Sequence, residues 1–424
     1  MDLNNYYYNV FKHKKMEVKD FIINREGLAD FYVLAIDENT VPSKSMVVFY
    51  NKNMMINRDI TNLAITAYNK IYSQKSLIIV DSMAASGVSS IRILKECRNV
   101  KKIYINDINP IAIKLIKKNI TLNKLDKPKH KIEISRKDAN FLLSEIVQDD
   151  CFTSEQEKHK PNIISIDPFG TPNRYLDSAF KAIQKVNGLL CVTATDTPVL
   201  FGIKQNACIR KYLSKPLHSE YCKEIGARIL IYFISRMANI NNLGIIPLLT
   251  FSYKHFIRIF ALTFKNKKII TKFIKNYGYI IHCQYCGYRT TLKNQPLHIF
   301  EKCPLCNTKD TLDYAGPLWL EEIHDIQFIK EILILNQKIG YKCKNRIDKL
   351  LNLALEEINM PVSYYNIHKL SQNLKLPYVP KMHVIQNKIK EKGYKVSRTH
   401  FDFLSIKTNM GLNLIKDSLL DLKI

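Results

Sequence analysis

Residues 76–90, SLIIVDSMAASGVSS, join an apolar run to a series of small residues. The run from Leu77 to Val80 is apolar and mostly β-branched, as is typical of a buried strand, and the apolar spacing over 87–98 predicts a helix. Small residues where a strand ends let the backbone pass close to a ligand. The segment therefore predicts a strand, a ligand-binding turn and a helix in succession.

The same alternation continues along the chain to residue 196. Asn109 and Pro110 provide a capping residue and a proline for the first position of one helix. Alternation of this kind predicts an α/β fold with a doubly wound parallel sheet, whose ligands bind at the carboxyl ends of the strands. The expected strands are 76–81, 101–107, 131–138, 162–167 and 188–196, and the expected helices are 87–98, 110–123, 139–148 and 174–186.

The first four of these strands end in an aspartate: Asp81, Asp107, Asp138 and Asp167. A single aspartate at such a place is more often a helix cap or a turn residue, but the repetition favours a ligand site. An acid after the second strand is placed to bind both hydroxyls of a ribose. The chain has neither a G-x-x-x-x-G-K-[ST] nor a G-x-G-x-x-G phosphate loop. A nucleoside without a phosphate cradle favours S-adenosylmethionine over NAD.

Residues 165–172, SIDPFGTP, contain the fourth acid. Asp167, Pro168 and Phe169 resemble the Asp/Asn-Pro-Pro-Tyr/Phe signature of methyltransferases that act on exocyclic amino groups. An arylamine is a weak nucleophile, and acceptors for its hydrogens favour a nitrogen whose lone pair can attack a methyl donor. Phe169 would stack on a base extruded from its helix. The alternative is a structural Asp-Pro turn after a buried strand.

Two Cys-x-x-Cys pairs lie further along the chain. Cys283, Cys286, Cys303 and Cys306 have the spacing of two knuckles that together form a closed tetrahedral zinc site. A closed site is structural because it leaves no position for a substrate. A redox dithiol is the alternative, although the pairs lack the βαβ setting of that motif. Ten cysteines in 424 residues do not suggest a disulfide framework.

The charge of the chain points to a polyanionic partner. Lysine and arginine number 64 against 38 acidic residues, giving a formal net charge of +26 that is spread along the sequence. A lysine-rich genome bias is the alternative explanation. The length predicts two or more domains. Apolar runs such as 229–234 are too short to cross a membrane, and the first 15 residues lack the apolar core of a signal peptide, so we expect a soluble intracellular protein.

The last 65 residues predict a nucleic-acid-binding module. Residues 362–374 and 380–393 have helical spacing, and 394–408 predict a strand, a turn and a second strand. This order is typical of a helix-turn-helix with a wing, in which Arg398, His400 and Lys407 could contact phosphates. A winged helix can equally dock on a protein.

Long segments of the sequence resemble one known family, the tRNA guanine-26 N2-dimethyltransferases of archaea and eukaryotes. The resemblance covers nearly the whole chain. Its segments are VFYNKNMMINRD (48–59), DSMAASG (81–87), INDINPIAI (105–113), KDAN (137–140), DPFGTP (167–172), VTATDTPVLFG (192–202), IRKYLSKPLHSEYCKEIGARIL (209–230), AGPLWL (315–320) and GYKVSRTHFDFLSIKT (393–408).

The resemblance implies roles for individual residues. Asp167, Pro168 and Phe169 would be the catalytic group. The family has an arginine close behind the small-residue loop, but Ser89 stands at that place here and Arg92 follows one turn later, so it is open whether Arg92 reaches the cofactor. The zinc ribbon occurs in some members only. S-Adenosylmethionine would contact Arg58, Asp81, Ser86, Gly87, Asp107, Asp138 and Ala139, and the RNA would contact Arg210, Lys211, Arg398, His400 and Lys407.

The expected organisation follows from these readings. Residues 1–265 would form a Rossmann-like methyltransferase domain, and 266–424 an α+β tRNA-binding domain with a zinc ribbon near 280–310 and a winged-helix-like segment near 360–415. The expected reaction is transfer of methyl groups from S-adenosylmethionine to N2 of guanine 26 of tRNA, by a monomer with a structural zinc ion. An archaeal source would place it in the cytoplasm, and a eukaryotic one in the nucleus or mitochondrion. The alternatives are methylation of another base or of protein glutamine, and a non-catalytic RNA-binding protein.

Overall fold

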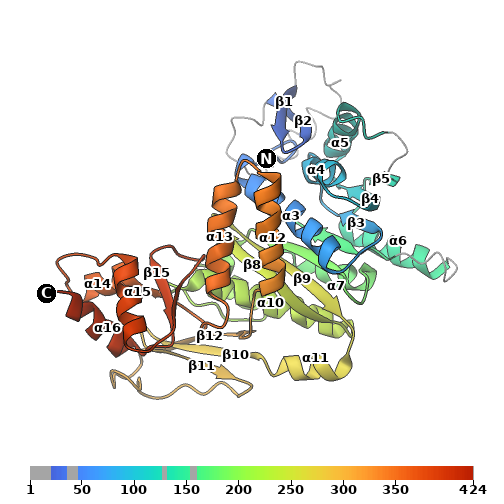
Figure 1. Cartoon of the computed structure of the whole chain (residues 1–424). Coiled ribbons are helices and arrows are strands. Elements are labelled where there is room, and N and C mark those ends of the chain that lie inside the picture. Colours follow the sequence, from blue (N-terminus) through green and yellow to red (C-terminus); the bar gives the residue numbers. More distant parts are fainter. Residues whose placement is uncertain (1–20, 36–45, 127–130, 153–159, 424) are drawn as a thin grey trace, which may run out of the picture. The chain divides into compact units, whose positions relative to one another are not determined.

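The computed structural model describes residues 21–35, 46–126, 131–152 and 160–423 (Figure 1). The chain divides into two compact units, residues 1–192 with 330–347 and residues 193–329 with 348–424. The sequence analysis instead predicts a functional boundary at residue 265, between a cofactor-binding and an RNA-binding part. That functional division stays a prediction. No helix in the described ranges is long and apolar enough to cross a membrane.

The first unit is built on the parallel strands that the sequence predicts. They lie in the order β5-β4-β3-β6-β7, so the chain leaves β3 toward one edge and returns to pair β6 on its other side. The carboxyl ends of the neighbouring strands β3 and β6 thus mark the switch point where ligands of such sheets bind. The strands are β3 (Leu77–Asp81), β4 (Val100–Asn106), β5 (Lys131–Ser135), β6 (Ile163–Ile166) and β7 (Leu189–Ala194).

Helices alternate with these strands, as predicted. The cap at Asn109 is confirmed, because its side chain accepts a hydrogen bond from the backbone amide of Ile111 at the start of α5. Apolar faces of the helices are buried, for example at Ile91, Leu115 and Leu143, which are at most 1% exposed. The helices are α4 (Val88–Glu96), α5 (Pro110–Leu122), α6 (Ala139–Phe152) and α7 (Asn173–Ala182).

The central sheet is mixed, and this corrects the expectation of a purely parallel sheet. Strands β8 (Gly244–Tyr253) and β9 (Phe256–Phe264) pair antiparallel, and the full strand order is β5-β4-β3-β6-β7-β9-β8. Only Lys254 and His255 separate the two strands. A connection this short can join antiparallel but not parallel neighbours.

The first unit also contains a hairpin and helices outside the alternating region. The hairpin pairs β1 (Phe21–Glu26) with β2 (Ala29–Leu34). The short helix η2 (Lys52–Met54) leads into α3 (Met55–Ile71), most of whose first half is buried. The later helices α12 (Ile326–Ile339) and α13 (Lys344–Glu356) each pass from one unit into the other.

The second unit has its own sheet, in the order β11-β10-β12. Its strands are β10 (Tyr277–Cys283), β11 (Arg289–Lys293) and β12 (Leu312–Trp319), and both pairs are antiparallel. The preceding helices are α8 (Thr197–Leu200), α9 (Gln205–Tyr212), α10 (Cys222–Ile240) and α11 (Lys267–Ile274).

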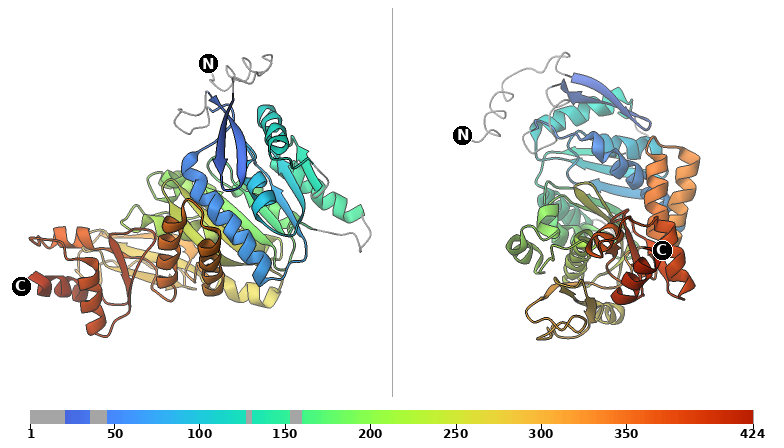
Figure 2. Two further views of the ribbon diagram at one scale, coloured as in Figure 1. Left: turned by 45° about the horizontal axis from the view of Figure 1, so that its top comes forward. Right: turned by 90° about the vertical axis from the view of Figure 1, so that its left-hand side faces the viewer.

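The C-terminal module gathers short strands and helices around one core (Figures 1 and 2). The first predicted helix begins at residue 367 rather than 362, because Tyr365 and Asn366 pair with β15 instead. Ile385, Ile406 and Ile415 are fully buried in the core. The elements are β13 (Tyr365–Asn366), α14 (Ile367–Asn373), α15 (Met382–Glu391), β14 (Val396–Arg398), β15 (Ser405–Thr408), α16 (Leu412–Leu420) and η3 (Asp421–Lys423).

Candidate active site and metal centre

Hydrogen bonds tie the carboxyl ends of the strands together. The Asn106 amide, 1% exposed, donates to the carbonyls of Ser82 (3.0 Å) and Lys137 (2.9 Å). Its oxygen accepts from the Ser135 hydroxyl (2.7 Å) and the Lys137 backbone amide (3.0 Å). The Ser82 hydroxyl donates to the Ser165 carbonyl at 2.7 Å. Four strand ends are thus fixed to one another, and Asn106, which the sequence analysis missed, is the centre of that network.

Asp107 holds the small-residue loop in place. Its carboxylate accepts hydrogen bonds from the backbone amides of Ala85 and Asn109, each at 2.8 Å. Burial raises the pKa of the Asp107 carboxyl, and these backbone hydrogen bonds oppose the shift. Ala85 and Gly87 have positive φ values of 48° and 77°, which bend the backbone tightly before α4. The loop and the acid predicted to bind the cofactor are therefore one connected structure.

The other predicted cofactor residues lie on the same edge. Asp81 is 6% exposed and accepts a hydrogen bond from the Ser90 hydroxyl at 2.6 Å. Asp138 is exposed and caps the start of α6 through the amide of Asn140 at 2.9 Å. Ser86 and Ala139 are buried. The strand ends thus place all four predicted acids at one edge of the sheet, as the sequence predicts.

Two large apolar side chains are exposed beside these acids. Ile108 follows Asp107 and is 65% exposed, and Phe141 lies in the first turn of α6, three residues after Asp138, and is 58% exposed. The exposed apolar groups could pack on the flat face of a base, and the acids beside them could accept hydrogen bonds from its polar edge. The residues present therefore fit an adenosine group, and the sequence analysis did not single out these two.

The segment after β6 exposes an acid and an aromatic ring. Asp167 is half-buried, and no hydrogen-bond donor among the described residues contacts its carboxylate. Pro168 is buried, and Gly170 has a φ of 87°, which turns the chain there. Phe169 is 45% exposed and meets the ring of Phe49 edge to face. A carboxylate without a donor among the described residues thus lies two residues before an exposed aromatic ring.

Arg58 is held by an acid of the hairpin. Its Nε and Nη2 donate to the two carboxylate oxygens of Glu26 at 2.7 and 2.6 Å, and Nη2 also donates to the Asn51 carbonyl at 3.1 Å. The Tyr50 hydroxyl donates to the same carboxylate at 2.8 Å. Arg58 is 9% exposed, so at most its remaining nitrogen, Nη1, is available to the predicted cofactor.

Arg92 does not belong to the acidic edge. Its side chain is fully buried and donates two hydrogen bonds to Glu96, each 3.0 Å long. Its Nη1 lies 2.7 Å from Asp59 and 3.6 Å from Glu26, and the guanidinium lies over the ring of Tyr341. Three carboxylates thus hold it in the interior. These contacts indicate a structural role for Arg92, and whether it replaces the family arginine missing at Ser89 stays untested.

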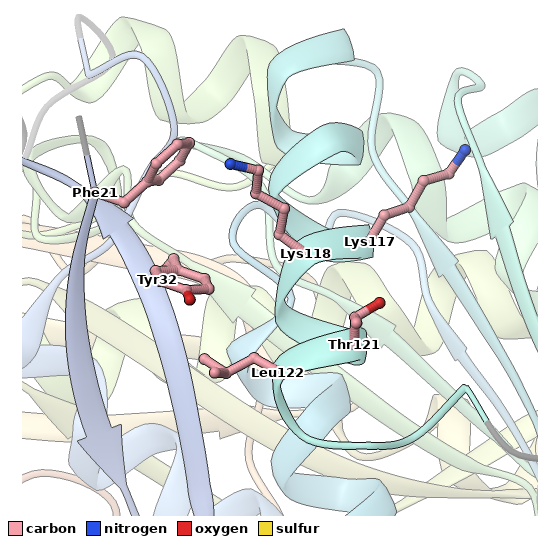
Figure 3. A pocket seen from close by; sticks show the side chains of 6 residues that line it. All are labelled: Phe21, Tyr32, Lys117, Lys118, Thr121 and Leu122. Atoms are coloured by element: carbon pink, nitrogen blue, oxygen red, sulfur yellow. The ribbon is translucent and has the colours of Figure 1, made fainter. Parts of the chain in front are cut away.

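A hollow of about 470 Å³ lies between the hairpin β1–β2 and the second half of α5 (Figure 3). Lys118 places its ammonium group 4.0 Å from the centre of the Phe21 ring at this hollow. None of the residues predicted for the cofactor or for catalysis lines it. Its lining consists of Phe21, Tyr32, Lys117, Lys118, Thr121 and Leu122.

The four predicted zinc ligands come together at the end of β10. The Sγ atoms of Cys283 and Cys306 are 3.8 Å apart, and those of Cys286 and Cys303 are 3.6 Å apart. A tetrahedral site with Zn–S bonds of about 2.3 Å requires S–S separations of about 3.8 Å. The residues therefore fit a structural zinc ion.

Backbone amides support the two knuckles. The amides of Tyr288 and Leu305 each donate to a cysteine sulfur, Cys286 and Cys303 respectively, at 3.4 Å. Leu305 also packs against the core of the C-terminal module. The second cysteine pair is therefore anchored to that module.

The predicted RNA contacts differ in their accessibility. His400 and Lys407 are only 5% and 2% exposed, and they pair with Glu357 (2.6 Å) and Glu224 (2.7 Å). This corrects the expectation that these two reach phosphates, because buried acids hold both in the interior.

Arg210 is exposed on α9. Its neighbour Lys211 lies 3.4 Å from Asp196. Arg398 is half-buried and donates to the Phe403 carbonyl at 2.7 Å. Of the five predicted contacts, Arg210 is thus the one that stands freely on the surface.

Comparisons with known proteins identify the family to which the chain is similar. Curated relatives described as tRNA (guanine(26)-N(2))-dimethyltransferases include one from Methanosphaera stadtmanae, 35% identical over 404 residues, 95% of this chain and 98% of the relative. One from Methanobrevibacter smithii is 36% identical over 88% of this chain and 92% of its own length. A relative from Aquifex aeolicus, described as acting on guanine 26 and guanine 27, is 32% identical over 92% of this chain and 93% of its own length.

A solved structure extends the similarity to the fold. Trm1 from Pyrococcus horikoshii, solved as a complex with S-adenosyl-L-methionine, superposes with a TM-score of 0.78 at 28% identity, covering 94% of this chain and 99% of that one. The sequence model of a family described as N2,N2-dimethylguanosine tRNA methyltransferase matches residues 29–420. The chain therefore belongs to the family of N2,N2-dimethylguanosine tRNA methyltransferases.

Proposed function

We propose that this enzyme transfers methyl groups from S-adenosylmethionine to the exocyclic N2 of guanine 26 in tRNA, forming N2-methylguanosine and then N2,N2-dimethylguanosine. The observation that carries the proposal is the Asp167 carboxylate, which has no donor among the described residues and stands beside the exposed ring of Phe169. Relatives with over 90% of their length matched are described as acting on this guanine.

Asp167 and Pro168 would activate the amine. The Asp167 carboxylate and the Pro168 carbonyl accept the two hydrogens of N2, which turns the nitrogen lone pair toward the methyl donor. Asp167, or solvent, then takes the proton that N2 loses when the N–C bond forms. Dimethylation repeats the same step, so the pocket must accept a nitrogen that already has one methyl group.

The base would be held by aromatic rings. A guanine inside a tRNA must leave its stack before its amino group can be reached, and a ring that replaces the lost stacking lowers that cost. Phe169 is 45% exposed and is supported from the side by Phe49. The buried Pro168 and the turn at Gly170 keep this ring beside Asp167.

The acidic edge would hold the cofactor, which supplies the electrophilic methyl group. Asp107 would accept hydrogen bonds from the ribose hydroxyls, and Ile108, Asp138 and Phe141 would surround the adenine. Arg58 and the loop after Asp81 would bind the amino acid end. The loop from Ala85 to Gly87 is already fixed by Asp107, which reduces the ordering cost of binding.

The C-terminal module would bind the tRNA backbone, and the net charge of +26 would attract its phosphates. The order of elements from α14 to β15 supports a winged-helix-like arrangement. Arg210 and the accessible part of Arg398 are the predicted contacts that we retain. We expect the enzyme to act as a monomer.

Nucleoside analysis tests this proposal. The purified protein is incubated with isotopically labelled S-adenosylmethionine and unmodified total tRNA, and the tRNA is digested to nucleosides. We expect label in N2-methylguanosine and N2,N2-dimethylguanosine. Label confined to another nucleoside would refute the proposed target atom.

A further inference from the structure

A second group of potential metal ligands lies inside the second unit, apart from the cysteines. His324 follows β12, Glu357 follows the last turn of α13, and His400 follows β14. One ligand atom from each lies within 4.8 Å of the others. All three residues are at most 5% exposed. Three segments that are distant in sequence thus bring two imidazoles and a carboxylate to one buried point.

The hydrogen bonds of this group leave several polar atoms unused. One oxygen of Glu357, Oε1, accepts from both the backbone amide and the Nδ1 of His400, each at 2.6 Å. The Nε2 of His400, both ring nitrogens of His324 and the Oε2 of Glu357 have no hydrogen-bond partner within the part of the chain that the structure describes. Buried polar atoms are normally paired, so these four need an explanation.

The hydrogen bond between Glu357 and His400 has the form seen around metal ions. A histidine that binds a metal with one nitrogen usually donates its other N–H to a carboxylate, which fixes the tautomer and the orientation of the ring. When Nδ1 donates to Glu357 and Nε2 carries no proton, as a metal ligand requires, the lone pair of Nε2 points away from that carboxylate. The ring of His324 lies next to it, with the two ring centroids 5.4 Å apart.

The nearby charges do not satisfy these atoms. Lys407 lies 2.7 Å from Glu224 and 3.6 Å from the Oε2 of Glu357, and Arg228 also bonds Glu224, at 2.9 Å. Lys407 and Arg228 thus both pair with Glu224 at short distances, whereas the distance from Lys407 to Glu357 is longer. Neither cation forms a hydrogen bond with the nitrogens of His324.

We propose that His324, Glu357 and His400 bind a divalent transition-metal ion, and we commit to zinc. Two imidazoles and a carboxylate are a common donor set for zinc, and zinc binds such ligands without a redox change. The ion would join the segment after β12 to the end of α13 and to the turn between β14 and β15. Three protein ligands leave a fourth position for water, but burial of the site keeps substrates from it, so the ion would be structural. The proposal does not depend on the proposed RNA target.

Zinc content per chain tests the proposal. The full-length protein is produced with added zinc, freed of loosely bound metal by gel filtration, and analysed by mass spectrometry of the metal. We expect two zinc ions per wild-type chain. The Cys303→Ser/Cys306→Ser variant and the His324→Gln/His400→Asn variant should each retain one. The matched control His383→Gln, an exposed histidine of α15, should retain two.

Cobalt spectroscopy identifies the ligands even if a histidine variant folds poorly. Cobalt(II) bound to the Cys303→Ser/Cys306→Ser protein should show weak visible d–d bands and no band from thiolate charge transfer. One zinc ion per wild-type chain, lost in the cysteine variant, would overturn the proposal, as would the absence of cobalt bands in that variant. A buried water molecule that bridges the same atoms would then explain why they lack partners.

Discussion

The ring of Phe169 meets the ring of Phe49 edge to face, with centroids 4.6 Å apart and an interplanar angle of 79°. Phe49 precedes α3 and Phe169 follows β6, so the contact joins two segments that are 120 residues apart. Phe49 supports Phe169 from one side while leaving 45% of Phe169 exposed. An aromatic ring held in this way can stack on a base without first being ordered.

Phe169→Ala should lower kcat/KM for tRNA. Stacking of a base on an aromatic side chain is worth about 1–3 kcal/mol, which corresponds to a loss of about 5- to 150-fold. Steady-state kinetics with saturating S-adenosylmethionine measure it, and the affinity for the cofactor should not change. Phe169→Tyr should keep most of the activity, and Phe300→Ala, at a position 42% exposed, serves as the matched control. Equal activity of Phe169→Ala and the wild type would exclude stacking.

Asn106→Ala should weaken cofactor binding without removing any group that touches the cofactor. The substitution breaks the hydrogen bonds to Ser82, Ser135 and Lys137, and leaves buried partners unpaired at a cost of about 1–3 kcal/mol. We expect the Kd for S-adenosylmethionine to rise about tenfold in calorimetry, with tRNA affinity unchanged. Asn352→Ala, which removes one local hydrogen bond on α13, should leave the Kd unchanged.

Arg92→Met should destabilise the protein while leaving cofactor affinity nearly intact. It removes the guanidinium that Asp59 and Glu96 share, and breaking a buried charge network costs about 3–5 kcal/mol. Denaturant unfolding measures the loss. Arg98→Met, at an exposed position, is the control. If Arg92→Met kept full stability but lost much of its cofactor affinity, Arg92 would instead belong to the cofactor site.

The pH dependence of the same variant gives a second readout. Burial opposes ionisation of Glu26 and Glu96, but arginine partners outweigh it and lower the pKa of both carboxyls below the ordinary 4.5. Their stabilisation is therefore present above pH 4.5 and is lost as the pH falls below it. Asp59 acts in the opposite sense, because burial raises its pKa. The stability difference between the wild type and Arg92→Met should shrink as the pH falls below about 4.5.

Cys303→Ser/Cys306→Ser should remove one zinc ion per chain and expose the ribbon to proteases. The loop between β11 and β12 has little apolar core of its own, so the metal site should contribute most of its order. We expect new cleavage within residues 284–311 in limited proteolysis. The kcat at saturating tRNA should stay near that of the wild type, since the ribbon has no catalytic group. Cys222→Ser should change neither readout.

The parallel strands and their acidic ends could be predicted because the signal is local. Ile and Val runs, small residues and caps such as Asn109 follow one another within a few positions, and the topology of such folds then places the carboxyl ends on one edge. The four cysteines were predictable for the same reason, since each knuckle is encoded in four residues.

Partners far away in the sequence determine whether three basic side chains are buried: Arg92, His400 and Lys407. Glu96, which binds Arg92, is itself bonded by the hydroxyl of Tyr341, 245 residues further on. His400 pairs with an acid 43 residues away, and Lys407 with one 183 residues away. A local sequence pattern does not show whether a basic residue pairs with a distant buried acid. The sequence therefore predicted a surface position for His400 and Lys407, which are buried in the structure.

Methylation of defined tRNA transcripts tests the central claim most directly. Wild-type protein and Asp167→Ala are each incubated with S-adenosylmethionine and with transcripts that carry guanine or adenine at position 26, and the nucleosides are measured by mass spectrometry. We predict N2-methylguanosine and N2,N2-dimethylguanosine only from wild-type protein with guanine 26, while Asp167→Ala still binds both substrates. Methylated product from Asp167→Ala would contradict the account. Equal amounts of N2-methylguanosine from the adenine-26 and the guanine-26 transcripts would also contradict it, because the methylated guanine would then lie elsewhere in the tRNA.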